Sequence, residues 1–300
     1  MSTTVTTPTT TMTPMVPTTP ITEPFQRNLK AIGIIWYREV LRYIRDWTRV
    51  ITSLMQPLLF LFIFGAGLSS SINVASSQLP PGAQLDFQTF IFPGVLSMTV
   101  LFTAIFSAVS IVWDREFGFL REVLVAPISR TSVVLGKAFG GSTIAMLQGT
   151  IMLIFAPVIG VKLSVGLVVV LMLEMLLLAF TLTCLGIVIA SRMKSMEGFQ
   201  MIMQFILMPM FFLSGALFPL RNLPHWLSFL TKLDPVTYGV APLRQAVLSS
   251  LGLPNFVLDQ LGVNVTLFGQ TLTPATELAI VAALGLIFVT LAAVLFNRQD

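Results

Sequence analysis

Charged side chains are scarce in this sequence. Only 10% of its 300 residues are Asp, Glu, Lys or Arg, whereas a typical soluble domain has about 25%. Hydrophobic residues make up 55% of the chain, and the mean hydropathy is +0.89. A chain with so few polar side chains has too little polar surface to cover a globular fold in water. The composition therefore predicts a polytopic membrane protein.

Cysteine and histidine are almost absent, because Cys184 and His225 are the single residues of their types. One cysteine excludes a disulfide framework, and the two residues together are too few for a metal cluster. The sequence also lacks a phosphate-binding loop of the form GxxxxGK[ST]. We therefore expect a protein that is not an enzyme, binds no cofactor or metal, and hydrolyses no ATP itself. The net charge of +4 follows the membrane pattern described below, so no nucleic-acid partner is expected.

The first 24 residues are rich in threonine and proline, with eleven Thr and five Pro, which predicts a disordered tail over 1–24. Over 25–49, apolar residues recur every three or four positions, and Arg38, Arg42, Arg45 and Arg49 form a basic stripe. This pattern is typical of an amphipathic helix lying flat at a membrane surface. A helix packed on soluble protein is the alternative.

Six apolar runs follow within a predicted membrane domain over 50–300. A helix needs about 20 residues to cross the hydrocarbon layer. The runs lie near 50–68, 90–113, 134–157, 164–190, 199–219 and 278–296. The predicted fold is thus an all-α integral membrane protein with six transmembrane helices.

The basic residues lie unevenly on the two sides of these spans. If the six runs cross in turn, thirteen of the 17 Lys and Arg residues fall on the side of the termini and four on the other. Basic residues accumulate on the cytoplasmic side of membrane proteins. We therefore expect a multi-pass protein of the plasma membrane, the inner membrane in a bacterium, with both termini in the cytoplasm.

The connection between the second and third runs is unusually charged for its length. Its charged residues are Asp114, Arg115, Glu116, Arg121, Glu122 and Arg130. Glu116, Leu120 and Leu124 recur at helical spacing, and Pro127 ends the pattern because proline disfavours helix at and before its position. We predict a short amphipathic helix parallel to the membrane on the cytoplasmic side. A solvated turn would also explain the charges, but not the apolar residues between them.

The segment after the fifth run also has helical periodicity. Pro209 is expected to break that run and Pro219 to end it. Two short amphipathic patterns follow, divided by "DPVTYG". They predict a re-entrant helical hairpin between spans five and six, which is tolerated where protein or water covers the backbone. An ordinary periplasmic loop is the alternative.

Glu174 is the one acid well inside a predicted span, where ionisable groups are costly and often functional. Gln148 lies at a matching depth in the preceding span. A hydrogen bond between these two side chains is one hypothesis, and a carboxylate that contacts substrate is the other. Phenylalanines could also line an apolar path: Phe60, Phe62, Phe64, Phe102, Phe106, Phe205, Phe211 and Phe212.

Two stretches resemble a known family, the membrane subunits of type-2 ABC exporters and particularly the daunorubicin-resistance type of permease. "WDREFGFLREVLVAPISRTSVVLGKAFGG" is similar to the family's first cytoplasmic loop and the span that follows. Residues 211–248 resemble its fifth span and the segment after it. The matching residues there are Ser214, Gly215, Pro219, Pro224, Asp234, Pro235, Tyr238 and Arg244. The resemblance covers about 25–296.

The resemblance implies a homodimer or close heterodimer of permeases that works with two ABC ATPase subunits, which hold ATP and Mg. It implies that the charged connection is a coupling helix, which docks on the ATPase through Glu116, Phe117, Arg121, Glu122 and Pro127. The expected activity is export of a drug-like, amphipathic or lipid-linked compound. Export of a polysaccharide or glycolipid is the alternative within the family. A transporter driven by an ion gradient fits less well, since one acid and no visible inverted repeat argue against it.

Overall fold

The computed structural model describes residues 24–67, 87–118, 128–218, 220, 223–251, 265–267 and 270–297. The tail over 1–23 lies outside these ranges. The described α-helices are α1 (Pro24–Arg45), α2 (Trp47–Leu59), α4 (Phe87–Ser107), α5 (Val109–Glu116), α7 (Arg130–Leu153), α8 (Val165–Arg192), α9 (Met196–Leu213), α10 (His225–Leu233), α11 (Thr237–Ser249) and α13 (Pro274–Asn297). Short elements complete the described fold: a π-helical turn η1 (Phe60–Phe64), a 3-10 turn η3 (Ala156–Ile159), and the antiparallel pair β1 (Thr266–Leu267) and β2 (Gln270–Thr271). The predicted all-helical class is confirmed.

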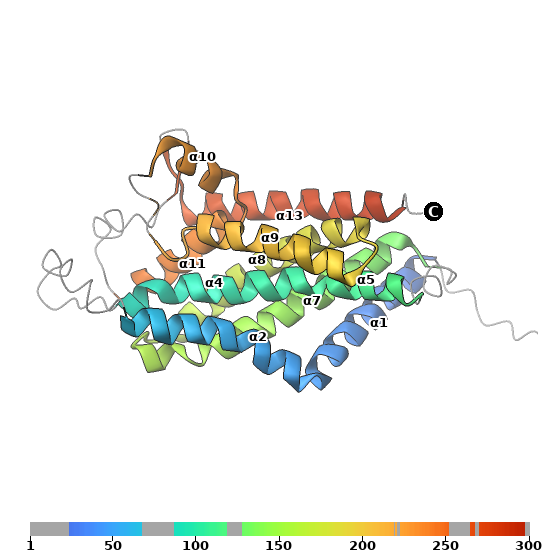
Figure 1. The fold of residues 1–300 in the computed structure, drawn as a ribbon, viewed down its shortest axis with the longest axis horizontal. Helices are drawn as coiled ribbons and strands as arrows, with labels where there is room; N and C mark the ends of the chain where they lie inside the picture. Colours follow the sequence, from blue (N-terminus) through green and yellow to red (C-terminus); the bar gives the residue numbers. More distant parts are fainter. Residues whose placement is uncertain are drawn as a thin grey trace, which may run out of the picture.

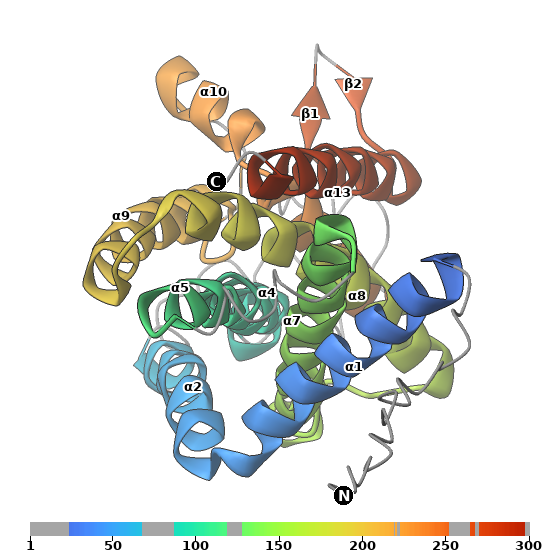
Figure 2. The ribbon, with the colours of Figure 1, turned by 90° about the vertical axis from the view of Figure 1, so that its right-hand side faces the viewer.

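The long helices form a bundle with two distinct ends. In Figure 1, α2, α4, α7, α8, α9 and α13 run along the long axis of the molecule. Helix α1, helix α5 and the end of α13 lie together at one end, which we call the α1 end. Helices α10 and α11 lie at the opposite end, the α10 end. Viewed from the α1 end, α1 runs diagonally across the end of α7, against which it packs (Figure 2).

Five described stretches are long and apolar enough to cross a membrane. They are Trp47–Gly67, Phe87–Glu116, Val165–Arg192, Met196–Leu213 and Pro274–Asn297. They correspond to the predicted runs near 50–68, 90–113, 164–190, 199–219 and 278–296. The remaining run, near 134–157, forms α7, which has 24 residues but is not among these apolar stretches.

Helix α7 lies at the centre of the bundle and packs against α1, α4, α8 and α13. Its surface carries glycines where other helices approach closely. A β-carbon on Gly136 would lie 2.8 Å from the β-carbon of Ile35, and one on Gly140 would lie 2.8 Å from the β-carbon of Glu39. Two small residues four apart are a common contact between membrane helices. The glycines that lower the hydropathy of α7 thus allow α1 to pack against it.

Three predicted boundaries differ in the structure. The helix expected over 25–49 is divided at Asp46, whose carboxylate accepts a hydrogen bond from the Arg49 N–H at 3.1 Å and caps α2. The residues Asp114 to Glu116 form the last turn of α5 in line with the second candidate span. Pro209 lies within α9 and does not break it; the helix ends at Leu213. Proline is tolerated in membrane helices because neighbouring groups compensate for the lost hydrogen bond.

Candidate functional site

A cluster of buried charges joins three helices at the α1 end. The Lys137 ammonium on α7 lies 2.8 Å from the Asp114 carboxylate on α5 and 3.1 Å from the Glu39 carboxylate on α1. It also donates to the Ser110 hydroxyl at 3.0 Å. The Arg38 guanidinium lies 2.9 Å from Asp114 and 3.0 Å from Glu39. We call Arg38, Glu39, Asp114 and Lys137 the ion-pair cluster.

The cluster is electrically balanced, with two positive and two negative groups. Glu39, Asp114 and Lys137 are buried, and the side chain of Arg38 is 43% exposed. Burial alone would raise the pKa of Glu39, but Lys137 and Arg38 outweigh it and hold that pKa below its ordinary value. Burial would lower the pKa of Arg38, but Asp114 and Glu39 outweigh it and raise that pKa. Glu39 and Arg38 are therefore both charged at neutral pH.

The two residues after Asp114 bind the ends of two more helices. The Arg115 guanidinium donates to the main-chain carbonyls of Ser191 and Met193 at the end of α8. The Glu116 carboxylate accepts a hydrogen bond from the Met196 N–H, at the start of α9, at 2.9 Å. These contacts satisfy backbone groups that a helix end leaves without partners. Phe117, which follows, is 58% exposed.

The other end of the charged connection is held in the same way. The Ser129 N–H donates to the side-chain oxygen of Asn28 on α1 at 3.0 Å. The Arg130 guanidinium donates to the Asn297 carbonyl, at the end of α13, at 3.0 Å. Arg121, Glu122 and Pro127 lie outside the described residues, so the predicted surface helix stays a prediction. Both ends of the connection are nevertheless attached to the helix bundle.

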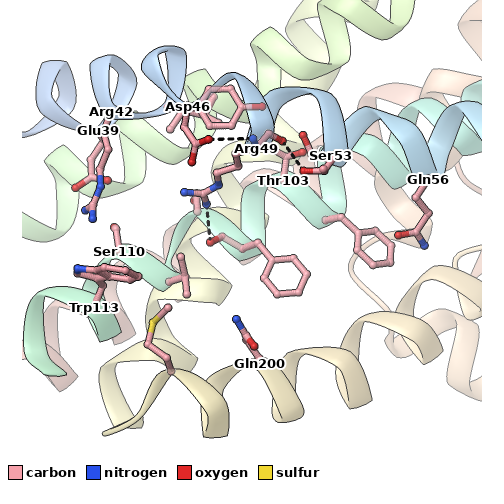
Figure 3. Close-up of a pocket in the computed structure, with 18 residues that line it drawn as sticks. Glu39, Arg42, Asp46, Arg49, Ser53, Gln56, Thr103, Ser110, Trp113 and Gln200 are labelled. Atoms are coloured by element: carbon pink, nitrogen blue, oxygen red, sulfur yellow. Dashed lines mark hydrogen bonds between the residues drawn. The ribbon is translucent and has the colours of Figure 1, made fainter.

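A cavity of about 520 Å³ lies beside the ion-pair cluster. It is enclosed by the junction of α1 and α2, by α4 and α5, and by the start of α9 (Figure 3). Arg49 extends into this space, where its guanidinium lies 3.4 Å from the Phe106 carbonyl oxygen. Gln56 and Gln200 line the cavity with the aromatic rings of Phe102 and other residues. Its size and its mixture of apolar walls with a few polar groups are typical of small-molecule sites.

A chain of phenylalanine rings leads from this cavity. Phe106 stacks near Phe102 with ring centres 6.5 Å apart, and Phe102 meets Phe211 of α9 at 6.4 Å. Phe211 meets Phe60 at 6.0 Å, and Phe60 stacks on Phe64 at 4.8 Å. These contacts join five of the eight rings considered for an apolar path, and Phe212 is a sixth. Phe212 also contacts Phe211, at 5.6 Å, whereas Phe205 is 81% exposed.

The α10 end is held by a buried arginine and by close backbone contact. Arg244 on α11 donates to the carbonyl oxygens of Gly215 at 2.6 Å and Ala216 at 2.8 Å, and lies over the Phe90 ring. Gly215 has a φ of +74°, in the left-handed region that favours glycine. A β-carbon on Gly94 would overlap the Ala216 carbonyl oxygen. Ser214, the first residue beyond α9, is buried in this turn.

The remaining motif residues connect α10 to α11. Pro224 precedes α10, and the Asp234 carboxylate that follows it accepts a hydrogen bond from the Val236 N–H at 3.0 Å. Pro235 lies between the helices, and the Tyr238 hydroxyl donates back to the Lys232 carbonyl at 2.7 Å. Burial raises the pKa of Asp234 to about 8 against the effect of the Val236 hydrogen bond. Pro219 lies outside the described residues.

The structure does not bring Gln148 and Glu174 into a hydrogen bond. The Gln148 amide donates to the Ser53 hydroxyl and, at 3.3 Å, to the Val50 carbonyl, both on α2. One Glu174 oxygen has no hydrogen-bond partner within the described part of the chain. Helix α7 presents Gly149 to α8, which turns Gln148 toward α2. Matching depth in two spans does not fix the direction around the helix axis, and the structure directs the Gln148 amide to α2 rather than to Glu174.

Sequence reasoning missed the ion-pair cluster. From the sequence, Arg38 and Lys137 indicate only orientation, and Asp114 belongs to the charged connection between the second and third runs. A buried salt bridge between distant helices leaves little local pattern. One signal is present in the sequence: Lys137 lies in the first turn of the otherwise uncharged run near 134–157, and a buried lysine requires a partner.

The helix lengths and hydropathy define a multi-pass integral membrane protein. A family model described as ABC-2 type transporter matches residues 30–248, so the chain belongs to that family. Its members are transport permeases, and membership implies an ABC ATPase partner.

Three relatives illustrate the similarity. The transport permease ycf38 of Cyanophora paradoxa is 31% identical over 197 residues, 65% of this chain and 66% of that protein. The inner membrane transport permease YadH of Escherichia coli (strain K12) is 25% identical over 230 residues, 75% of this chain and 85% of that protein. The "Probable multidrug ABC transporter permease YbhR" of the same strain is 28% identical over 173 residues, 56% of this chain and 46% of that protein. The match thus spans just under two thirds of ycf38 and less than half of YbhR.

Proposed function

We propose that this chain is the permease of an ATP-driven exporter, which moves a drug-like, amphipathic or lipid-linked compound outward across the plasma membrane. Two copies, or one copy and a related permease, form the pathway above two ABC ATPase subunits that bind ATP and Mg. The name of YbhR supports the drug-like class only weakly. Export of a polysaccharide or glycolipid remains the second candidate.

One observation carries the coupling role: both ends of the charged connection are attached to the helix bundle. Asp114 binds α1 and α7 through the ion-pair cluster, Arg115 binds the end of α8, and Glu116 binds the start of α9. At the other end, Ser129 binds α1 and Arg130 binds the end of α13. A force applied to residues 117–128 would therefore reach five helices through short polar contacts. We assign Glu116, Phe117, Arg121, Glu122 and Pro127 to the contact with the ATPase on this basis.

This role defines the orientation. The α1 end faces the cytoplasm, α1 lies in the membrane interface, and both termini are cytoplasmic. Helix α7 is the sixth span, shielded from lipid by its neighbours. Helices α10 and α11 form the re-entrant hairpin at the outer surface, where Arg244 and Gly94 fix its attachment to α4 and α9.

Charge reversal tests the coupling. The variant Glu122→Lys should insert normally but lose its affinity for the ATPase, because removing one partner of a desolvated charge pair costs about 2–5 kcal/mol. Co-purification with the ATPase and ATP hydrolysis by the reconstituted complex are the measurements. Glu197→Lys is the matched control, since Glu197 is an exposed acid at the same end. Normal binding and hydrolysis in Glu122→Lys would exclude the coupling role.

The cavity and the phenylalanine chain support the substrate class. A compound entering beside Arg49 and Gln200 would meet polar groups first and then apolar rings, which suits a molecule with a polar head and an apolar body. Glu174 remains a candidate contact for a cationic substrate, because one of its oxygens has no partner in the described structure.

Transport in inside-out vesicles tests this path with two probes, ethidium and a fluorescently labelled phosphatidylethanolamine. Phe102→Ala should reduce uptake of the transported probe about tenfold, because it removes the ring between the cavity and Phe211. Phe205→Ala is the control, since this ring is 81% exposed and outside the chain of rings. ATP-dependent uptake of neither probe would favour the glycan-exporting alternative.

A further inference from the structure

A second cavity, of about 480 Å³, lies between α1 and the end of α5 and shares Arg42 and Trp113 with the first cavity. Arg38, Arg42 and Arg45 line it, together with Leu41, Trp113 and Asp114. The three arginines are four and three residues apart, so they lie on one face of α1. The cavity is therefore a basic groove between α1 and the end of α5.

The positive charge in this groove is not compensated within the described part of the chain. Asp114, the one acid lining it, is already bound to Lys137 at 2.8 Å and to Arg38 at 2.9 Å. Arg42 and Arg45 form no salt bridge with any described residue. The Arg42 guanidinium lies 5.5 Å from the centre of the Trp113 ring, which positions it at the wall of the groove.

The surroundings place the groove at the level of lipid headgroups. On α1, large apolar side chains are exposed beside the arginines: Ile34 is 67% exposed, Tyr37 60% and Ile44 49%. A helix with this combination lies at the boundary between headgroups and acyl chains. Trp113 is 39% exposed at the same place, and tryptophan is enriched at membrane interfaces. A soluble partner would have to cover this apolar surface, whereas a membrane covers it directly.

We propose that this groove binds the phosphate of an anionic phospholipid from the cytoplasmic leaflet. Arg42 and Arg45 donate to the phosphate oxygens. The Arg38 guanidinium, of which one nitrogen is paired with Glu39 and Asp114, lies beside them. Guanidinium groups suit this ligand because their N–H groups match two phosphate oxygens at once. Trp113 and Leu41 contact the glycerol and upper acyl region. The bound lipid is a resident of the interface and is separate from the transported compound.

The experiment counts lipid bound to the purified full-length chain in detergent, by native mass spectrometry with phosphatidylglycerol. Wild-type protein should retain phosphatidylglycerol in preference to phosphatidylcholine. The variant Arg42→Gln/Arg45→Gln should bind phosphatidylglycerol roughly 30-fold more weakly, because the charge-assisted hydrogen bonds of two guanidinium groups to the phosphate are lost. Arg42→Lys/Arg45→Lys should recover part of the affinity, because charge remains but the paired hydrogen bonds do not.

The matched control is Lys30→Gln/Lys194→Gln, which removes two exposed positive charges from the same end but outside the groove. It should change binding less than about twofold, since a detergent micelle has no extended anionic surface. An equal loss in both double variants would show general charge attraction and overturn the proposal. Competition by inorganic phosphate or glycerol phosphate would show a soluble-anion site instead. Loss of the ATPase from Arg42→Gln/Arg45→Gln, with lipid binding unchanged, would assign the groove to that protein partner.

Discussion

The two ends of the bundle stabilise their buried charges differently. At the α1 end, Lys137 and its partners neutralise one another across three helices. At the α10 end, the partners of Arg244 among the described residues are main-chain carbonyls and an aromatic ring, and Asp234 accepts a hydrogen bond from a main-chain N–H. Neither residue forms a salt bridge with any described residue. The α1 end thus joins separate helices through side-chain charges, whereas the α10 end fixes backbone turns.

This difference agrees with the roles proposed for the two ends. Ion pairs between side chains can connect helices that come from distant parts of the sequence, and five helices meet the charged connection at the α1 end. The hydrogen bonds of Arg244 to the Gly215 and Ala216 carbonyls instead attach α11 to the turn after α9 and hold the shape of that turn. Removing charge should therefore affect the α1 end through helix association and the α10 end through local backbone conformation.

The largest expected effect is at the α1 end, in Lys137→Met. It leaves the buried carboxylates of Glu39 and Asp114 with Arg38 as their remaining cation. Breaking a buried ion pair in this way costs about 3–5 kcal/mol. Thermal unfolding of the purified variant in detergent is the measurement. Glu39→Gln/Lys137→Met removes one charge of each sign and should be more stable than the single variant. Equal stability of Lys137→Met and wild type would contradict the ion-pair cluster.

The next effect is at the α10 end, in Gly94→Ala. The new β-carbon would overlap the carbonyl oxygen of Ala216, which is backbone and so moves only with its turn. We expect a loss of about 1–3 kcal/mol, as for other overpacked sites. The control is Gly166→Ala, because no atom lies within 4 Å of its new β-carbon. If the two variants have the same unfolding midpoint, α4 and the turn after α9 are not in contact.

Gly136→Ala should have a smaller effect than Gly94→Ala. Its β-carbon would lie 2.8 Å from the β-carbon and 2.9 Å from a methyl group of Ile35, which can yield by a small shift of α1. We expect about 1 kcal/mol of destabilisation. Gly33→Ala on α1 has no neighbour within 4 Å and is the control. Cross-linking of a cysteine pair between α1 and α7 would also decrease if the contact is as described. Unchanged cross-linking and stability would show that α1 and α7 are not in close contact at Gly136 and Ile35.

Much of the fold could be predicted because a helix that crosses the lipid hydrocarbon must consist mostly of apolar residues, and such runs are visible in the sequence. The five apolar runs that form candidate spans were identified, and the α10 and α11 helices match their predicted periodicity. The division at Asp46 was not predicted, although an aspartate followed by a helix is a usual N-cap signal.

The site was predicted less well because it depends on which helices become neighbours. Depth along a span is given by sequence position, but direction around the helix axis depends on packing. Gln148 therefore binds α2 instead of Glu174, and Lys137 binds two acids that come from distant positions. The motif residues around Arg244 could be identified only through resemblance, since no local pattern specifies that its guanidinium binds the carbonyls of Gly215 and Ala216.

The smallest predicted effect is a pH dependence that distinguishes the two ends. Burial raises the pKa of the Asp234 carboxyl from its ordinary value of 3.8 to about 8. The folded protein therefore holds this proton more tightly than the unfolded chain does. The resulting stability is fully present below pH 3.8 and is lost as the pH rises through about 8. Between pH 7 and pH 8 the loss should be about 1 kcal/mol, because the folded protein then keeps on average about three quarters of this proton.

Asp234→Asn cannot ionise, so its unfolding temperature should change less between pH 7 and pH 8 than that of the wild type. Glu197→Gln, which removes an exposed acid, should keep the wild-type slope. The α1 end should respond in the opposite direction, because the pKa of Glu39 is lowered by Lys137 and Arg38 against the effect of burial. Its stabilisation is present above the ordinary value of 4.5 and is lost as the pH falls through the lower folded value. Parallel slopes for wild type and Asp234→Asn between pH 7 and pH 8 would show that Asp234 is not buried as a neutral acid, and the contrast between the two ends would then rest on Arg244 alone.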